Sequence, residues 1–203
     1  MTGQTGERKR GRPTASEREE RREIILDAAV ALFLDEGYGH VSVDAIAERS
    51  GVTKRTLYIY FGDKSEIFAA AVGRLHDRVI REAEDRAERL PELSRRIVRT
   101  LHSAEAVALH RLVIAESGRF PDLAAAFYRA GPERYRALLA ERLIATAGSG
   151  IAREALAEAL FSLLLGEAHR RRLLGILGPI TDSEVARHAD AALRVLGLGE
   201  GRP

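Results

Sequence analysis

Apolar side chains recur at three- and four-residue spacing along most of this 203-residue chain, and glycine or proline separates one such stretch from the next. This is the period of an amphipathic α-helix, and no stretch alternates apolar and polar residues as a half-buried strand does. The pattern therefore predicts an all-α fold. The spacing is clearest in Ile24, Ile25, Ala28, Ala29, Leu32 and Phe33, which end at Gly37.

Cap residues and helix-breaking residues set the expected boundaries. Ser16, Ser42 and Thr53 each precede a periodic stretch and are candidate N-caps. Asp63 and Glu66 have the spacing of a capping box, which would open a long fourth helix. The expected helices cover residues 17–36, 43–50, 54–61, 64–90, 152–174 and 182–196, with further helices between Pro91 and Gly148.

The composition excludes several classes of protein. The chain has no cysteine, which removes disulfides, thiolate nucleophiles and cysteine-based zinc or iron–sulfur sites. No run approaches ~18 apolar residues, and the first residues are charged, unlike a signal peptide. We therefore expect a cytoplasmic protein with no membrane contact and no cofactor.

The charge is balanced overall but not locally. There are 32 Lys and Arg against 30 Asp and Glu, for a net charge of +2. Residues 1–16 nevertheless hold four basic side chains and one acidic one, and residues 53–60 contain no acid. Contact with nucleic acid would rest on these placed residues, and not on a broad basic face.

Residues 42–58 have the pattern of a helix-turn-helix. Two short helical stretches flank Gly51, which can take the positive φ that reverses the chain. Ala47 would let the helices cross closely, while Ile46, Val52 and Leu57 would pack between them. The second helix is narrow enough to enter a DNA major groove. The side chains left pointing outward on it are Lys54, Arg55, Thr56 and Tyr58.

A plain corner between two helices would explain the spacing of Ala47 and Gly51 equally well. The basic, acid-free stretch that follows and the basic segment at the N-terminus favour DNA binding instead. In that segment Arg10-Gly11-Arg12-Pro13 could lie along a narrow A·T-rich minor groove, which attracts arginine. A flexible solubilising tail is the alternative for these four residues.

One run of residues carries a family resemblance: Gly37-Tyr38, Ser42-Val43-Asp44-x-Ile46-Ala47 and Gly51-Val52-Thr53-Lys54-x-Thr56-Leu57-Tyr58-x-Tyr60-Phe61-x-x-Lys64-x-x-Ile67-Phe68. Over about residues 17–70 the chain resembles the N-terminal domain of TetR-family bacterial transcriptional regulators. The resemblance implies a homodimer of nine-helix subunits, each with a DNA-binding head and a ligand-binding, dimerising body. The implied segments are a flexible basic arm (1–15), a helix-turn-helix domain (16–62) and an effector-binding and dimerisation domain (63–203).

The resemblance also implies roles for individual residues. Family members often carry a small residue at the position of Arg55, and arginine there could read guanine with two hydrogen bonds. Arg55 therefore leaves the preferred operator open. The implied phosphate contacts are Ser42, Thr53, Tyr60 and Lys64, and the implied base contacts are Lys54, Arg55, Thr56 and Tyr58.

Residues beyond about 75 contain no phosphate-binding glycine loop and no arrangement of catalytic residues, so we expect no enzyme activity. We expect no metal site either, because the candidate ligands lack diagnostic spacing and are expected to be solvated. These candidates are His102, Glu105, His110, Glu116, Glu167 and His169.

A small-molecule cavity is expected from the architecture. Residues 112–133 resemble the C-terminal domain of TetR-family repressors of the AcrR/AefR kind, which implies an apolar or amphipathic effector. An ordinary core is the alternative for each candidate wall residue. The candidates are Leu101, Leu112, Phe120, Phe127, Tyr128, Tyr135 and Phe161, with His102 or Glu116 as polar anchors.

The last two helices are expected to form a four-helix interface with a second copy of the chain. Burial within one subunit is the alternative. The candidate interface residues are Leu156, Leu160, Leu163, Leu164, Leu173, Leu193 and Leu196, with Ala155, Ala159 and Gly166 allowing close approach.

The sequence thus predicts a dimeric repressor that binds a palindromic double-stranded DNA operator and is released by a small molecule. A DNA-binding protein of the same fold that acts through protein partners is the first alternative. A helical enzyme or adaptor with a vestigial helix-turn-helix is the second.

Overall fold

The computed structural model describes residues 14–86, 88–144 and 150–199. All regular structure in these segments is α-helical, as predicted. The described residues form ten helices, where the family resemblance implied nine. They are α1 (Ala15–Glu36), α2 (Val43–Arg49), α3 (Lys54–Tyr60), α4 (Lys64–Arg86), α5 (Leu90–Leu101), α6 (Ala104–Glu116), α7 (Pro121–Ala130), α8 (Pro132–Arg142), α9 (Gly150–Leu173) and α10 (Asp182–Val195). Pro132 has no N–H and restricts Gly131, so α7 ends there and α8 begins.

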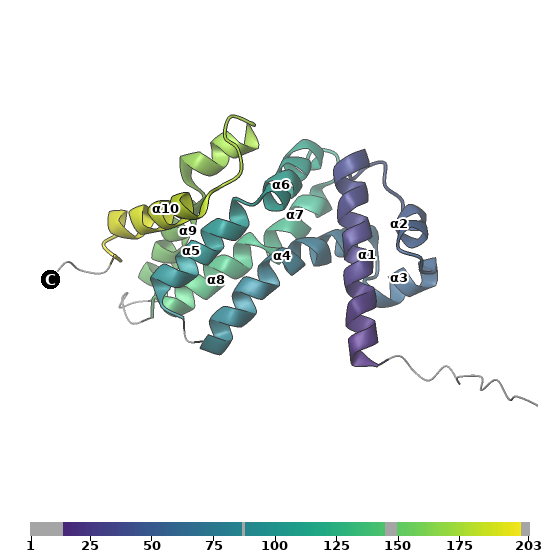
Figure 1. Cartoon of the computed structure of the whole chain (residues 1–203), viewed down its shortest axis with the longest axis horizontal. Helices are drawn as coiled ribbons and strands as arrows, with labels where there is room; N and C mark the ends of the chain where they lie inside the picture. The colour runs from purple at the N-terminus through teal and green to yellow at the C-terminus, as the bar shows by residue number, and fades with distance from the viewer. Residues whose placement is uncertain (1–13, 87, 145–149, 200–203) are drawn as a thin grey trace, which may run out of the picture.

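The helices form a small head and a larger body (Figure 1). Helices α1, α2 and α3 lie at one end, and α5 to α10 make the body at the other. Helix α4 runs from the head into the body, where it packs extensively on α7. No helix in the part of the chain described is both long and apolar enough to cross a membrane.

The head is built as the helix-turn-helix pattern predicts. Ile46 of α2 and Leu57 of α3 are completely buried against Phe33 of α1, and Val52 in the turn packs against this cluster. The head does not close its core alone, however. Ile67 of α4 and residues of α6 and α7 belong to the same cluster. The head is therefore held by the body that it is attached to.

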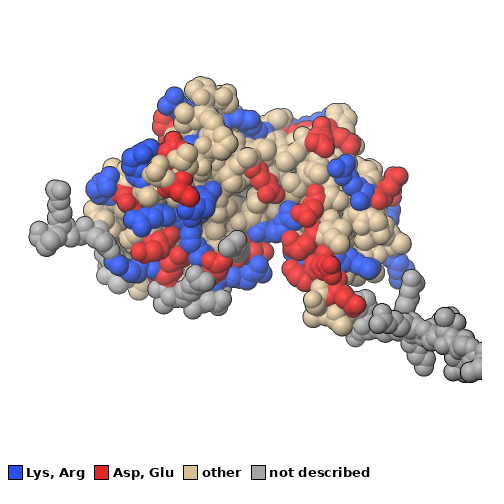
Figure 2. Space-filling model, viewed as in Figure 1, with Lys and Arg blue, Asp and Glu red and all other residues tan. Residues whose placement is uncertain are grey.

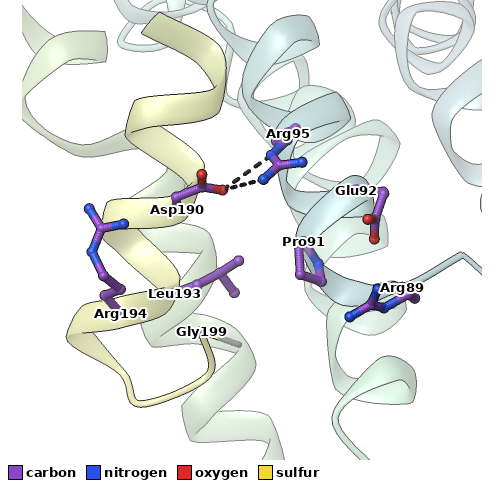
Figure 3. Close-up of a pocket in the computed structure, with 8 residues that line it drawn as sticks. All are labelled: Arg89, Pro91, Glu92, Arg95, Asp190, Leu193, Arg194 and Gly199. Carbon is purple, nitrogen blue, oxygen red and sulfur yellow. Dashed lines mark hydrogen bonds and ion pairs between the residues drawn. The ribbon is translucent and has the colours of Figure 1, made fainter. Parts of the chain in front are cut away.

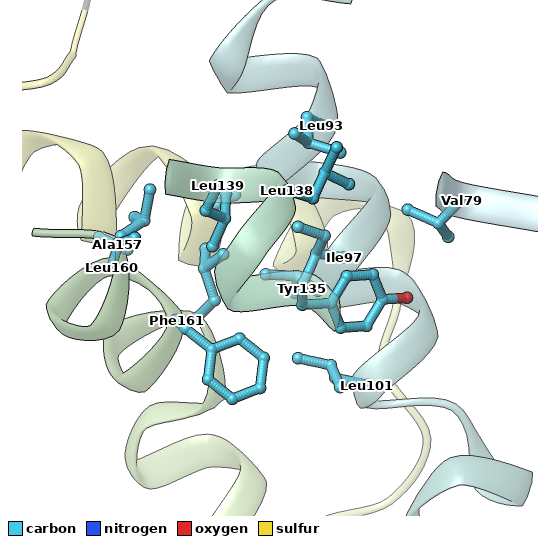
Figure 4. Packing of buried hydrophobic residues seen from close by; sticks show 14 of the residues in the cluster. Val79, Leu93, Ile97, Leu101, Tyr135, Leu138, Leu139, Ala157, Leu160 and Phe161 are labelled. Carbon is cyan, nitrogen blue, oxygen red and sulfur yellow. The ribbon is translucent and has the colours of Figure 1, made fainter. Parts of the chain in front are cut away.

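The core of the body lies where α5, α8 and α9 meet (Figure 4). Ile97 of α5, Tyr135 of α8 and Leu160 of α9 are completely buried there. Burial of each large apolar side chain contributes about 1.5–3 kcal/mol to folding. Leu93, Ile97, Val98 and Leu101 recur at helical spacing in the sequence, and the structure confirms that they lie on the buried face of α5.

The cap predicted for the first helix is wrong by two residues. Thr14, not Ser16, is the N-cap, and it forms a capping box with Glu17. Ser42 and Thr53 do cap α2 and α3, each accepting a backbone N–H three residues later. Asp63 Oδ1 likewise accepts the Glu66 N–H at 2.9 Å, at the start of α4.

Helix α9 contains a break that sequence did not predict. Gly166 has φ 59° and ψ −167°, a conformation essentially restricted to glycine. The nearby carbonyl of Leu164 accepts two imidazole N–H groups, from His102 Nε2 at 3.0 Å and His188 Nε2 at 2.9 Å. Gly166 thus re-directs the helix, and two histidines bind the carbonyl next to the break.

Part of the expected dimer surface is buried within the subunit. Leu160, Leu164 and Leu193 lie in the core of the body, so they cannot contact a partner. The periodicity showed an apolar face but not which neighbour covers it. The outward face of α9 carries mostly small residues. Ala152, Ala155 and Ser162 are exposed, and Ala159 and Gly166 are half-buried, as is the larger Leu163.

We predict that Gly166→Ala lowers the free energy of unfolding by about 1–3 kcal/mol, the cost of holding a non-glycine residue in this conformation. The new Cβ would also lie 3.1 Å from His188 Cε1. Chemical denaturation measures the loss. Gly118→Ala is the matched control, because a Cβ there meets nothing within 4 Å; equal stabilities of the two variants would contradict the prediction.

Candidate DNA-binding surface and ligand cavity

The turn before α3 is fixed by backbone geometry. Gly51 has φ 66°, and the Val52 N–H donates to the Ala47 carbonyl at 3.0 Å. Thr53 Oγ1 then accepts the Thr56 N–H at 3.2 Å and starts the helix. With Leu57 buried beneath it, α3 lies on the head with its opposite face in solvent.

The outward face of α3 carries most of the side chains predicted for it. Lys54, Arg55 and Tyr58 are exposed, whereas Thr56 is half-buried and its hydroxyl bonds that of Thr53 at 2.9 Å. Ile59 is also outward, with 71% of its surface exposed. An exposed isoleucine beside basic side chains offers an apolar contact. Ile59 was not among the predicted DNA contacts, because its side chain has no hydrogen-bonding group.

Lys54 already has an ionic partner. Its Nζ lies 2.9 Å from Asp44 Oδ2 of α2, and this hydrogen bond raises the pKa of Lys54. Both side chains are well exposed, so the pair adds little stability. A phosphate or base contact by Lys54 would have to replace this carboxylate.

Lys64 lies in the junction between head and body. Its Nζ donates to the carbonyls of Tyr38 at 2.7 Å and Val41 at 2.9 Å, and lies 4.3 Å from the centre of the Tyr38 ring. Burial lowers the pKa of Lys64. The ammonium therefore joins the start of α4 to the loop between α1 and α2, whatever further contact it makes.

Two residues expected in an effector cavity also lie in this junction. Phe120 packs edge-on against Tyr38, with ring centres 5.1 Å apart. Glu116 Oε1 accepts the Gly39 N–H at 3.5 Å. Both side chains thus attach the α6–α7 corner to the head and lie away from the central cavity described below.

The structure locates only some of the remaining residues that were predicted to contact DNA. Ser42 and Tyr60 lie on the head at the start of α2 and the end of α3. Arg10 and Arg12 fall outside the described residues. On the face shown in Figure 2, basic and acidic side chains are interspersed over head and body, which agrees with the near-neutral charge of the chain.

A small apolar cavity lies inside the body, lined by residues of α4, α5, α6, α7, α9 and the start of α8. Its volume is about 30 Å³, enough for about one water molecule. Leu101, Phe127 and Phe161 of the predicted set line it. The other lining residues are Val72, Leu75, His76, Ala106, Leu109, His110, Pro132 and Leu165.

The other predicted wall residues lie elsewhere. Tyr135 is buried, its hydroxyl 3.1 Å from His76 Nδ1. Tyr128 is exposed and accepts from Arg136, and Leu112 packs on the head cluster. His102 lines a separate pocket beside Arg172.

His76 and His110 are polar groups of the cavity that were not among the predicted ligand-binding residues. Burial lowers the pKa of both, that of His76 to about 4, so both are neutral at pH 7. A signal was available: each sits at a core position, His76 three residues before Val79 and His110 three before Val113.

The expectation that the candidate metal ligands are solvated is wrong for the histidines. His102 and His169 are buried, and His110 Nδ1 lies 3.0 Å from His169 Nε2. Interior packing of α5, α6 and α9 brings them together. In the chain as described, no three potential ligands converge on a metal position. Glu105 and Glu167 instead approach Arg74 and Arg170.

A polar hollow of about 330 Å³ lies between the start of α5 and the end of α10 (Figure 3). Arg95 donates from Nε and Nη2 to Asp190 Oδ1 at 3.1 and 2.9 Å. Basic and acidic side chains alternate around the hollow, and Asp190 already neutralises Arg95.

Comparison with known proteins places these features in a family. Residues 25–71 match the profile of bacterial regulatory proteins of the tetR family, and residues 88–197 match the C-terminal domain of AefR-like transcriptional repressors. The second match alone spans more than half of the chain. The chain belongs to the TetR family. Its members are transcriptional regulators and not enzymes.

Named HTH-type transcriptional regulators match over stretches of 60 and 63 residues. The transcriptional activator FasR of Mycolicibacterium smegmatis is 41% identical over 63 residues, 31% of this chain and 29% of FasR. The repressor KstR of the same organism is 43% identical over 60 residues, 30% of this chain and 29% of KstR. The match thus spans less than a third of either relative.

Solved TetR-family structures match over nearly the whole chain. A TetR-family regulator from Mesorhizobium loti superposes with a TM-score of 0.70 at 28% identity, covering 91% of this chain and 97% of that one. The flavonoid-responsive regulator FrrA gives 0.65 at 30% identity, covering 88% and 95%.

We predict that stability falls on acidification below about pH 6.5. Burial lowers the pKa of His76 and His102 to about 4 and of His169 to about 3, so the unfolded chain binds more protons between these values and about 6.5. Urea unfolding at pH 7.5, 6.0 and 5.0 measures the fall. His169→Gln should flatten it, with exposed His40→Gln as control; a wild-type curve level from pH 7.5 to 5.0 would refute the prediction.

Proposed function

We propose that the protein is a dimeric one-component repressor that binds a palindromic DNA operator and is released by a small molecule. The observation that carries this proposal is that α4 belongs to both parts of the machinery. Its first turn holds Lys64 against the head, and its middle supplies Val72, Leu75 and His76 to the cavity. The AefR-like repressor match supports repression.

DNA binding is assigned to the exposed face of α3. Two such helices in a symmetric dimer would enter successive major grooves about 34–36 Å apart, or somewhat more. Lys54, Arg55 and Tyr58 are available for bases, and Ser42, Thr53 and Tyr60 for phosphates. The basic arm with Arg10 and Arg12 would add contacts of low sequence specificity in the minor groove.

Dimerisation is assigned to the outward faces of α9 and α10. The small side chains of α9 permit close approach of another helix, and Val195 of α10 leaves 72% of its surface exposed. Half-buried Leu156, Leu163, Leu173 and Leu196 remain from the predicted set. A four-helix contact between two subunits would cover this surface.

The cavity favours an uncharged amphipathic effector. Its apolar walls carry two neutral imidazoles, which can bond hydroxyl or carbonyl groups, and no acid to hold a cation. The flavonoid-responsive regulator FrrA, similar to this chain, supports that chemistry. The effector must open a cavity of about 30 Å³, displace α4, and bind the DNA-incompetent state more tightly.

The small volume of the cavity also favours one alternative. A regulator that acts through protein partners needs no effector, and its body could stay closed as in this structure. The two proposals differ in one measurable respect, which is whether any small molecule changes operator binding.

For DNA binding, we predict that Arg55→Ala weakens binding to the operator about tenfold or more and binding to random DNA little, because it removes a base contact. Tyr60→Phe should weaken binding to the operator and to random DNA similarly, because it removes a hydroxyl group that would bind a backbone phosphate. Fluorescence anisotropy measures the two affinities, with a duplex from the DNA flanking the gene that encodes this protein and a scrambled duplex of the same length. We expect two chains to bind each operator. Equal losses on both duplexes for Arg55→Ala would remove its base-reading role.

For the effector, we predict that naringenin, an uncharged hydroxylated flavonoid, releases the operator, and that His110→Phe raises the concentration needed about tenfold by removing a hydrogen bond. Operator binding without ligand should not change. Tyr128→Phe, outside the cavity, is the control. Failure of naringenin and of a panel of other uncharged amphipathic molecules to act would support the effector-free alternative.

A further inference from the structure

Arg172, near the end of α9, is a buried guanidinium with little to neutralise it. Only 4% of the residue is exposed. Its Nη1 donates to His102 Nδ1 at 3.2 Å and to the Ala168 carbonyl at 3.3 Å, and its Nε has no acceptor. A carboxylate oxygen of Glu184 lies 3.8 Å away, beyond hydrogen-bonding distance. Burying a charge is costly unless it is closely paired.

The surrounding imidazoles cannot supply the missing negative charge. Because His102 Nδ1 accepts from Arg172, its proton is on Nε2, which donates to the Leu164 carbonyl. The rings of His169 and His188 lie 5.2 and 5.1 Å from that of His102. These rings are neutral or positive, so the cluster keeps the positive charge of its guanidinium.

An open pocket of about 210 Å³ gives access to this charge. It lies between α6, the end of α9 and residues 177–179. Arg111 on its rim is held in place, because it donates to the carbonyls of Arg172 and Leu173. The rest of the lining is His102 and small or apolar residues, including Val107, Ala108 and Leu177, with no acid among the residues that line it.

The hollow between α5 and α10 shows what a compensated site looks like in the same protein. There Arg95 has two donors on Asp190, as the dashed lines in Figure 3 show. The whole chain also has almost as many acids as bases. A pocket with two arginines, no acid and an apolar wall is therefore distinctive.

We propose that this pocket binds the carboxylate of a small organic acid, with the anion on Arg172 and the apolar part of the molecule against Val107, Ala108 and Leu177. A carboxylate matches the planar donor array of a guanidinium and would neutralise it. The site is distinct from the central cavity, whose neutral imidazoles suit an uncharged molecule. The inference does not depend on the proposed effector.

The test uses 4-tert-butylbenzoate and its uncharged analogue 4-tert-butylbenzamide with the full-length protein at pH 8, followed by calorimetry and thermal unfolding. We expect saturable binding of the benzoate and at least tenfold weaker binding of the benzamide. Arg172→Met should bind the benzoate at least tenfold more weakly. Because this variant removes an under-compensated buried charge, its melting temperature without ligand should be unchanged or higher.

Two further variants make the outcome decisive. Arg170→Met alters an exposed arginine of the same helix and should bind like the wild type. Ala108→Phe fills the pocket and leaves Arg172 unsubstituted. It should abolish binding, and it tests the proposal even if Arg172→Met fails to fold. No saturable binding by the wild type, equal binding of the benzamide, or binding that survives the Ala108→Phe change would overturn the proposal.

Discussion

The structure depends on α4, a single helix whose two halves are buried in two different hydrophobic cores. The head of α1 to α3 has too few apolar residues to close a core, and Ile67 and Phe68 of α4 complete it. Further along, Val79, Ile80 and Ala83 of α4 join the core of the body. Since a 23-residue helix is about 35 Å long and stiff, its ends cannot move independently. The position of the head is therefore set by packing inside the body.

The interior of the body is unusually rich in imidazole. Burial keeps His76, His102 and His169 neutral, and each then needs a specific tautomer. Arg172 fixes that of His102, and the Leu164 carbonyl beside the break in α9 receives the proton. The break, the buried histidines and the guanidinium form one connected arrangement, so substitution at one of them should be felt by the others.

The sequence predicted the features that depend on neighbours close in the chain. The fold class, the caps at Ser42 and Thr53 and the buried face of α5 follow from local spacing, and the structure confirms them. Thr14 and Ser16 both have a glutamate three residues later, so spacing could not choose between them. The break at Gly166 depends on His102 and His188 from other helices, which periodicity does not detect. For the same reason Leu160 and Leu164 could not be assigned to core or partner, nor Glu116 and Phe120 to junction or cavity.

The pair between Lys54 and Asp44 bears on how such a protein finds its site. A lysine that already holds a carboxylate releases fewer counterions on reaching a phosphate, so it contributes little to the attraction for arbitrary DNA. Under the proposed function, encounters with random sequence would then be brief, and less of the protein would be retained on DNA outside the operator. Under the proposed function, a nucleotide would replace Asp44 on Lys54 only where the other proposed contacts of α3 form together. In that case a surface carboxylate would shorten the search for the operator by making other DNA sites easy to leave.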